Sequence, residues 1–287
     1  MKHLIGIIAY KNSKSLEKCI SILKDSSDIV LHIDAKTNIA LFEKYKDDVF
    51  FIENRVSVSW GTISQVKAEL SILNFFYERG YDYISIISEA DLPMKKGEDI
   101  NQFLNQKIGF EFIGFLDKVS YKTYDNVKYK YFEFLQGKNN SLRKFYKTLR
   151  LNRLFKNNYY SRLPKLYKGS NWFTLSRECV GYILEFLQNH PWYIEAFEYS
   201  FLPDEIFFHT IIGNSDFLSK VYRFEERNEY ISSLRFIDWG NSGTSPNELK
   251  ADSVLEYRSQ SPEALFFRKI TEKSNFSKYE EIIKSGK

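Results

Sequence analysis

The chain has 287 residues, of which 43% are hydrophobic and 27% charged, and its formal net charge is +4, as in ordinary globular proteins. Its two cysteines, Cys19 and Cys179, lie far apart and form no CxxC pair, which argues against a disulfide framework or a structural zinc site. The sequence contains neither a ~20-residue apolar stretch nor a secretory signal, so we expect a cytoplasmic protein whose contact with a membrane is at most peripheral.

The first ninety residues predict alternating strands and helices. Residues 4–9 form a continuous apolar run that ends at polar positions, as a strand buried on both faces of a sheet should. The same patterns predict further strands at residues 29–34, 50–52 and 83–87, and helices over residues 16–23 and 62–78. This succession of βαβ units indicates an α/β fold with a mostly parallel sheet.

Carboxylates follow two of the expected strands. Asp34 ends the second strand, and Glu89 and Asp91 follow the fourth. In open α/β sheets, ligands bind beyond the carboxyl ends of the strands, so these side chains fall where a nucleotide would be held. A plainer role is open for each, since a carboxylate after a strand also caps the turn or helix that follows it.

Residues 118–168 differ from the rest of the chain. They contain 14 lysines and arginines against two acidic residues, Asp125 and Glu133, and they are rich in tyrosine and phenylalanine. We expect them to form an irregular or helical insertion within a single domain that spans residues 1–287. A basic and aromatic surface suits an anionic membrane, a nucleic acid or a phosphate-bearing acceptor, although most charge runs are only solvated faces.

The last part of the sequence predicts more helices and one strand. An amphipathic helix starts at Ser176 and stops at Pro191, and a second helix covers residues 203–212. A strand is expected over residues 234–239, and a final helical stretch carries Arg268 and Lys269.

Common cofactor and hydrolase motifs are missing from the sequence. It contains no GxGxxG, no P-loop, no HExxH and no GxSxG motif, and no DxD pair that would hold Mn²⁺ or Mg²⁺ on a diphosphate. The nearest approach to such a pair is Glu89-Ala90-Asp91, and one ExD is a weak signal for a hard cation.

Four segments of the sequence resemble the core-2/I-branching β-1,6-N-acetylglucosaminyltransferases and the related peptide O-xylosyltransferases. Their order and spacing fit that family, and the resemblance covers most of the chain except the basic insertion. The segments are Trp60-Gly61 with the helix that contains residues 66–70, residues 83–96 (YISIISEADLPMKK), residues 168–184 (KGSNWFTLSRECVGYIL), and Leu202-Pro203-Asp204-Glu205.

The resemblance implies a GT-A-type nucleotide-diphosphosugar transferase fold, inversion at the anomeric carbon, and a reaction for which metal is dispensable. By motif position, Glu205 matches the catalytic base and Asp34 a uracil contact. Arg235 and Lys269 match two basic groups on the diphosphate, and Arg268 could take the place of Lys269. We also expect the nucleotide at Ile7 and Ala9, and the donor or acceptor sugar at Trp60, Glu89, Asp91, Ser170 and Trp172.

The expected chemistry needs few groups. Inverting transfer requires one base within hydrogen-bond reach of the acceptor hydroxyl, and fixed cations stabilise the diphosphate as it leaves. Each residue also has a structural alternative: Glu205 could stabilise a helix start through the helix dipole, Arg235 could be a charge at a strand edge, and Trp172 could belong to the core.

The sequence therefore predicts an inverting transferase that moves a sugar, with N-acetylglucosamine favoured, from a UDP-sugar to a glycan hydroxyl. The acceptor would be a glycan or lipid-linked glycan of envelope polysaccharide or glycolipid synthesis. A transferase that uses UDP-xylose or another UDP-hexose is the alternative within the same fold. Two alternatives are not transferases: a nucleic-acid-binding protein that uses the insertion, and a sugar-binding module without catalytic activity. We favour the transferase, and for it we expect no nucleic-acid partner.

Overall fold

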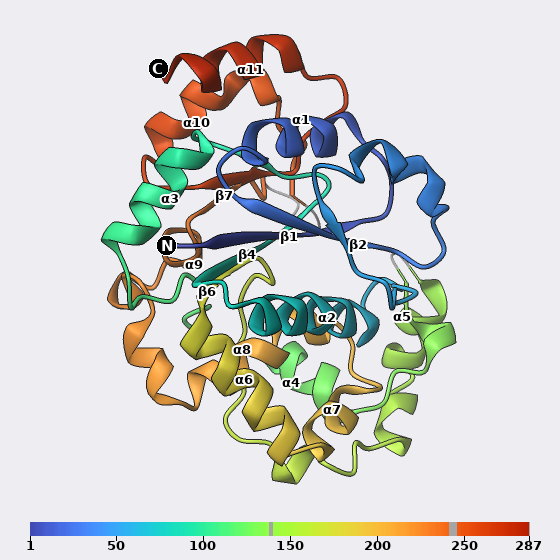
Figure 1. Cartoon of the computed structure of the whole chain (residues 1–287). Coiled ribbons are helices and arrows are strands. Elements are labelled where there is room, and N and C mark those ends of the chain that lie inside the picture. Colours follow the sequence, from blue (N-terminus) through green and yellow to red (C-terminus); the bar gives the residue numbers. More distant parts are fainter. Residues whose placement is uncertain (138–139, 241–245, 287) are drawn as a thin grey trace.

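The computed structural model describes residues 1–137, 140–240 and 246–286 and confirms the expected α/β fold, of GT-A type with a mostly parallel central sheet (Figure 1). Its sheet elements are β1 (His3–Ala9), β2 (Asp28–Ile33), β3 (Phe50–Phe51), β4 (Tyr83–Ser88), β5 (Leu92–Pro93), β6 (Thr174–Ser176), β7 (Arg235–Ile237) and β8 (Phe266–Arg268). The helices are α1 (Lys14–Leu23), α2 (Ser64–Arg79), α3 (Gly97–Gln106), α4 (Tyr121–Lys128), α5 (Ser141–Thr148), α6 (Arg177–Asn189), α7 (Trp192–Phe197), α8 (Phe207–Gly213), α9 (Glu229–Ser233), α10 (Val254–Gln260) and α11 (Phe276–Ser285).

The central sheet has the strand order β3-β2-β1-β4-β6. Strands β3, β2, β1 and β4 are parallel, and the short edge strand β6 pairs with β4 in the antiparallel direction. Every residue of β1 is buried, which explains its unbroken apolar sequence. Helices cover both faces: α1, α3, α10 and α11 lie on one side and α2, α6 and α8 on the other (Figure 1).

A second, three-stranded sheet has the order β5-β8-β7 and joins the C-terminal part of the chain to the region after β4. Here the sequence prediction was wrong, because Arg268 ends strand β8 and Lys269 follows it, whereas the last helix begins only at Phe276. Short apolar runs such as Leu265-Phe266-Phe267 fit a buried strand and a buried helix equally well by periodicity. The neighbouring strands decide between them.

The expected helix over residues 203–212 is interrupted. Residues Pro203–Glu205 form one turn of 3₁₀ helix, and α8 starts after Ile206, whose φ of −128° departs from helical geometry. The interruption separates the acidic pair Asp204-Glu205 from the buried helix that follows it.

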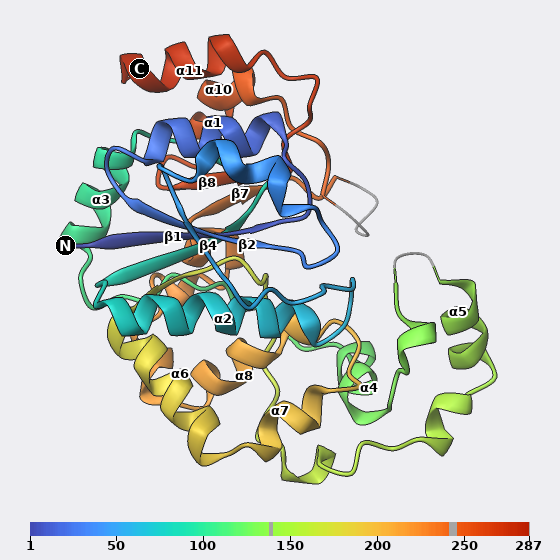
Figure 2. The ribbon, with the colours of Figure 1, turned by 45° about the vertical axis from the view of Figure 1, so that its right-hand side comes forward.

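The described part of the basic insertion contains α4, α5 and three short 3₁₀ helices. Helix α4 packs on the main core through Val127, whereas α5 belongs to a small lobe beside the main body (Figure 2). The lobe has a separate small core, made by Tyr129, Tyr131, Leu135 and Tyr146 together with Phe201 of the main body. Within the described residues, every helix is too short or too polar to cross a bilayer.

Candidate active site

Two of the expected site residues, Asp34 and Glu89, lie beyond the carboxyl ends of β2 and β4, near the side chain of Tyr10 at the end of β1. The ring of Tyr10 is 40% exposed, but its hydroxyl donates a hydrogen bond to Oε1 of Gln65 (2.8 Å) on α2. The pKa of this hydroxyl is raised, first by burial and then by four carboxylates around it: Glu89, Asp204, Glu69 and Asp34. Acidic groups from two strand ends, from α2 and from the turn before α8 therefore share one region.

Glu205 lies at the edge of this region with its carboxylate partly exposed. Its Oε2 atom forms an ion pair with Nζ of Lys168 (2.7 Å), and about a quarter of each side chain is open to solvent. Asp204, its neighbour, is partly buried, and its pKa is raised to about 7 by burial and then by the charge of Glu205. The two carboxylates thus differ, since Glu205 has a cation and access to solvent, whereas Asp204 resists ionisation.

Close backbone contacts hold Glu205 in place. Leu202 adopts a left-handed conformation (φ 56°), and its N–H donates to the carbonyl of Gly61 (3.0 Å), so two of the sequence motifs meet in space. The N–H of Gly169 donates to the carbonyl of Glu205 (3.0 Å). A Cβ atom at Gly169 would lie 1.8 Å from the carbonyl oxygen of Gly114, so only glycine fits beside Lys168. A non-glycine residue at positive φ is uncommon and is often found at functional sites.

Arg268, Asp91 and Trp172 form a second cluster. Nε of Arg268 lies 2.9 Å from Oδ1 of Asp91, and its guanidinium stacks over the ring of Trp172 at 4.2 Å from the centroid. Oδ2 of Asp91 accepts hydrogen bonds from N–H and Oγ–H of Ser88 (2.6 and 3.0 Å), so it also caps the turn after β4. Trp172 is buried in the core and serves as the platform for the cation.

Lys269 has a different environment from Arg268. Its side chain is partly exposed, and within the described residues its Nζ atom has no ion pair or hydrogen bond. Of the two adjacent cations, Lys269 is therefore the one that can reach a ligand without breaking an existing contact.

Arg235 is enclosed by the protein, close enough to Asp91 and Arg268 to feel their charges. Only 2% of it is exposed, and its guanidinium donates to the carbonyls of Ser233 (2.9 Å) and Phe173 (3.0 Å) and to Oγ1 of Thr174 (3.1 Å). It packs over the ring of Phe266 at 4.7 Å, and burial lowers its pKa. This position does not match the expected contact with a diphosphate, because the guanidinium is already enclosed and occupied.

Asp34 is held by its own loop. Its Oδ1 accepts hydrogen bonds from the N–H groups of Lys36 (2.9 Å) and Val58 (3.4 Å), and Oδ2 lies 3.4 Å from Nζ of Lys36. Asp34 thus caps the turn after β2, which is the structural alternative that the sequence offered, and its side chain is only 5% exposed. The uracil contact stays a prediction. Ile7 and Ala9 are buried within β1, and the carbonyl of Ala9 accepts a hydrogen bond from the Asp34 N–H (2.9 Å).

The two remaining expected residues lie at the edges of the region. The N–H of Ser170 donates to Oε2 of Glu229 (3.1 Å). This hydrogen bond helps to hold the loop that contains Lys168. Trp60 is 46% exposed and packs edge-on against Phe201, where the main body meets the lobe of the insertion. Trp60 therefore belongs to the rim of the site.

Sequence reasoning missed Glu69 and Lys168 as site residues. Glu69 is fully buried on α2, accepts hydrogen bonds from Nε2 of Gln65 (2.9 Å) and Nδ2 of Asn171 (3.4 Å), and has a strongly raised pKa because of burial and the charge of Asp204. A single carboxylate on the apolar face of a helix was the signal for Glu69, since such a group is rarely buried without a reason. No spacing rule links Lys168 to Glu205 across 36 intervening positions.

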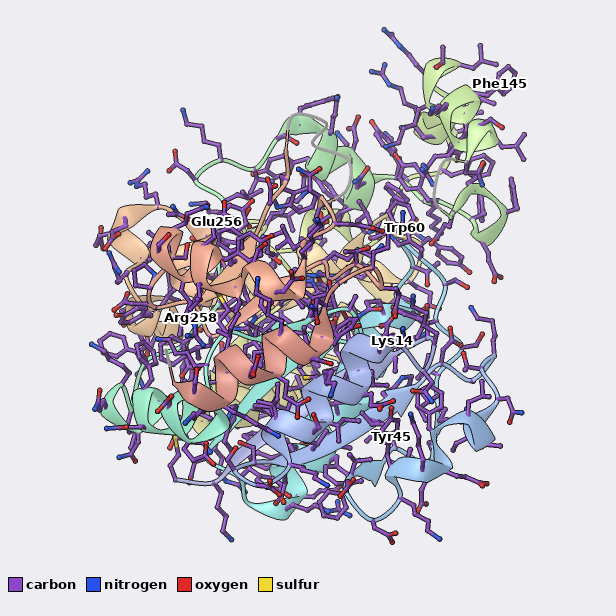
Figure 3. All side chains as sticks on the ribbon, turned by 90° about the horizontal axis from the view of Figure 1, so that it is seen from above. Lys14, Tyr45, Trp60, Phe145, Glu256 and Arg258 are labelled. Atoms are coloured by element: carbon purple, nitrogen blue, oxygen red, sulfur yellow. The ribbon has the colours of Figure 1, made fainter. Side chains whose placement is uncertain are left out.

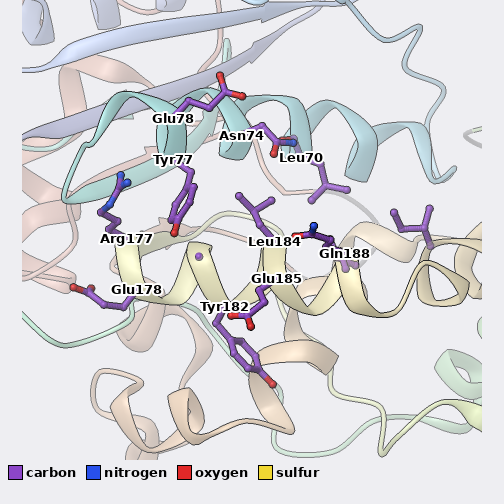
Figure 4. A pocket seen from close by; sticks show the side chains of 13 residues that line it. Leu70, Asn74, Tyr77, Glu78, Arg177, Glu178, Tyr182, Leu184, Glu185 and Gln188 are labelled. Carbon is purple, nitrogen blue, oxygen red and sulfur yellow. The ribbon is translucent and has the colours of Figure 1, made fainter.

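A large open groove elsewhere on the molecule contains none of these residues. It has a volume of about 1130 Å³ and lies between α2 and α6, where Tyr77 faces Arg177 (Figure 4). In residues 1–137, 140–240 and 246–286, no group of three or more His, Cys, Asp or Glu side chains is arranged to hold a metal ion. Independence from metal stays a prediction.

Glu89 supplies a test of the electrostatics of this region. Burial, aided by the charge of Asp91, raises its pKa to about 7, so between pH 4.5 and 7 the folded chain keeps a proton that the unfolded chain has released. The contribution of Glu89 to the free energy of unfolding therefore falls as the pH rises from 4.5 to 7. We expect Glu89→Gln to raise the melting temperature more at pH 8 than at pH 5, with a gain of at most about 3 kcal/mol. Glu281→Gln, on the exposed side of α11, is the control, and an equal effect of Glu89→Gln at both pH values would contradict the raised pKa.

Comparison with known proteins identifies the family of the chain. The family model of the core-2/I-branching enzymes matches residues 7–261. A xylosyltransferase of Ciona intestinalis is 23% identical over 278 residues, which covers 85% of this chain and 29% of the relative. Xylosyltransferase 2 of Rattus norvegicus is 25% identical over 269 residues, which covers 84% and 28%. The chain thus spans less than a third of the length of these relatives. By the match of the family model over most of its length, the chain belongs to the core-2/I-branching enzyme family of glycosyltransferases.

Proposed function

We propose that this glycosyltransferase inverts the anomeric carbon as it transfers a sugar from a UDP-sugar to a glycan hydroxyl, with Glu205 as the base. The observation that carries the proposal is the partly exposed carboxylate of Glu205, fixed by backbone contacts at the carboxyl edge of the sheet. Its Oε2 atom is paired with Lys168, which leaves Oε1 for the acceptor hydroxyl. One correctly placed carboxylate suffices for this step.

The cations of the site support a diphosphate leaving group. Lys269 is the first candidate to contact it, and Arg268, fixed between Asp91 and Trp172, adds a second positive charge nearby. Charges that are fixed before the reaction stabilise the leaving group as its negative charge develops. On this proposal the reaction needs no divalent metal. In this proposal Arg235 contributes by joining β7 to Phe173 and Thr174 at β6 rather than by touching the nucleotide.

The donor we favour is UDP-N-acetylglucosamine, and UDP-xylose is the second candidate, because the relatives named above are xylosyltransferases. The acceptor we propose is a glycan, carried on a lipid, for envelope polysaccharide or glycolipid synthesis in the cytoplasm. Backbone hydrogen bonds place Gly61, next to Trp60, and Gly169, next to Ser170, beside the turn that contains Glu205, which supports Trp60 and Ser170 as acceptor contacts in this proposal.

Binding of UDP tests the proposed diphosphate contact. We expect UDP at ~100 times its dissociation constant to stabilise the protein by about 2.7 kcal/mol, in EDTA as well as in Mn²⁺, because side chains supply the charge. Thermal shift with UDP-N-acetylglucosamine, UDP-xylose, UDP-galactose and UDP-glucose would rank the donors. Stabilisation that appears only after Mn²⁺ is added would show that Glu89 and Asp91 hold a metal and that the cations do not suffice.

A further inference from the structure

The lobe of the insertion exposes an apolar face that its own core does not use. On α5, Leu142 and Phe145 are 58% and 59% exposed, and Leu149, the C-cap residue of this helix, is 52% exposed. They are three and four residues apart, so they share one side of the helix. Leu154, in the 3₁₀ helix that follows, is 74% exposed. Isolated exposed apolar residues are ordinary, but four on one small lobe form a patch that marks an interaction.

Cations surround this apolar face. Lys144, Arg150, Arg153 and Lys156 are exposed, and none of them forms an ion pair with another described residue. The surface is therefore positive as well as apolar, and no described carboxylate pairs with these four cations.

Two further cations of the lobe point inward. Arg143 donates hydrogen bonds to the carbonyls of Leu135 and Gly137, and Lys147 donates to Oδ1 of Asn126 (2.9 Å) and lies over the ring of Tyr131. Burial lowers the pKa of Lys147 to about 8. The lobe thus divides its cations into an inner set that holds it together and an outer set that faces solvent.

The lobe also stands close to the active site. It is joined to the main body by Arg143, whose guanidinium lies 4.1 Å from the ring centroid of Phe201 and 5.8 Å from that of Trp60. Phe201 precedes Glu205 by four residues in the sequence. In Figure 3, Phe145 lies at the outer end of the lobe and Trp60 where the lobe meets the body.

We propose that this face, formed by Leu142, Phe145, Leu149 and Leu154 with Lys144, Arg150 and Arg153, docks the enzyme on an anionic lipid bilayer. A short amphipathic helix with exposed Phe and Leu beside Lys and Arg inserts its apolar side at the headgroup boundary, and the cations attract anionic lipids. The charge of the surface selects a bilayer over a second copy of the chain, because two copies of this cationic face would repel each other. The inference extends the proposed lipid-linked acceptor, and its test does not use the transferase reaction.

The test is co-sedimentation of the full chain with two kinds of vesicle, pure phosphatidylcholine and phosphatidylcholine with 30% phosphatidylglycerol. We expect binding to the anionic vesicles that weakens as salt rises. Replacement of Lys144, Arg150 and Arg153 by Gln should lower the partition coefficient by about 10²-fold, at ~1 kcal/mol for each cation near the surface. Phe145→Ser should lower it by about 10-fold or more.

Two controls separate the face from general charge and hydrophobicity. Ile108→Ser removes an equally exposed apolar side chain outside the lobe, and Lys278→Gln removes a cation on α11, so both should bind vesicles like the wild type. The proposal is wrong if the wild type stays in the supernatant, if it binds both kinds of vesicle equally, or if the lobe variants bind as the wild type does. A dimer in solution that Phe145→Ser dissociates, without vesicle binding, would assign the face to a second copy instead. Each result leaves the donor site to be judged separately by UDP binding.

Discussion

Glu205→Gln should lower turnover by about 10²–10⁴-fold while the protein stays folded and binds UDP normally. The substitution keeps the size of the side chain and its hydrogen bonds but removes its basicity, and general base catalysis contributes a factor of this size. The backbone contacts that hold residue 205, from Gly169 and through Leu202 to Gly61, do not involve the side chain. Transfer rate with UDP-N-acetylglucosamine and UDP-xylose, melting temperature and UDP affinity are the measurements.

The pair with Lys168 sharpens this experiment. The side chain of Glu205 is partly exposed, so loss of the ion pair should change the stability little. Lys168→Met removes the ion pair that holds Oε2 of Glu205 and should lower turnover, because the carboxylate is then less well positioned toward the acceptor hydroxyl. Glu281→Gln is the matched control for removal of an exposed carboxylate. A well-folded Glu205→Gln protein with a normal rate would remove Glu205 as the base, and Asp204 would be tested next.

Much of the fold could be predicted because its core strands are unambiguous. The run that became β1 is buried along its whole length, and such runs read clearly as strands in a parallel sheet. The prediction of a helix at Arg268 was wrong because the three residues of β8 are too few to show a periodic pattern. Their conformation depends on pairing with β5 and β7, which are distant in sequence.

The site could be predicted where residue type and motif suffice. Asp34 and Asp91 follow the buried strands β2 and β4, as the sequence pattern predicts, and Asp204, next to Glu205, lies near Asp34. The roles of these residues stay predictions. The ion pair of Lys168 and the burial of Glu69 depend on how distant segments pack, and no local pattern encodes that.

Mutations of Arg235 and Lys269, the two cations to which the family pattern gives the same role, should have different effects: loss of stability at Arg235 and loss of UDP affinity at Lys269. Arg235→Met removes three charge-assisted hydrogen bonds to Ser233, Phe173 and Thr174, and it should lower the free energy of unfolding by about 2–4 kcal/mol. Arg235→Lys should recover only part of this loss, because an ammonium group cannot reach all three acceptors with the geometry of the guanidinium. Chemical denaturation of the three proteins measures the difference.

Lys269→Met should behave in the opposite way. Its Nζ atom has no partner in the described part of the chain, so the stability should change by less than about 0.5 kcal/mol. If it contacts the diphosphate, UDP affinity should fall by roughly 10- to 100-fold, the value of one hydrogen bond to a charged group. The folded fraction of Arg235→Met should bind UDP nearly as well as the wild type. Normal stability with lost UDP affinity in Arg235→Met would mean that its guanidinium leaves the core to bind the nucleotide, and the buried position would then not be its working one.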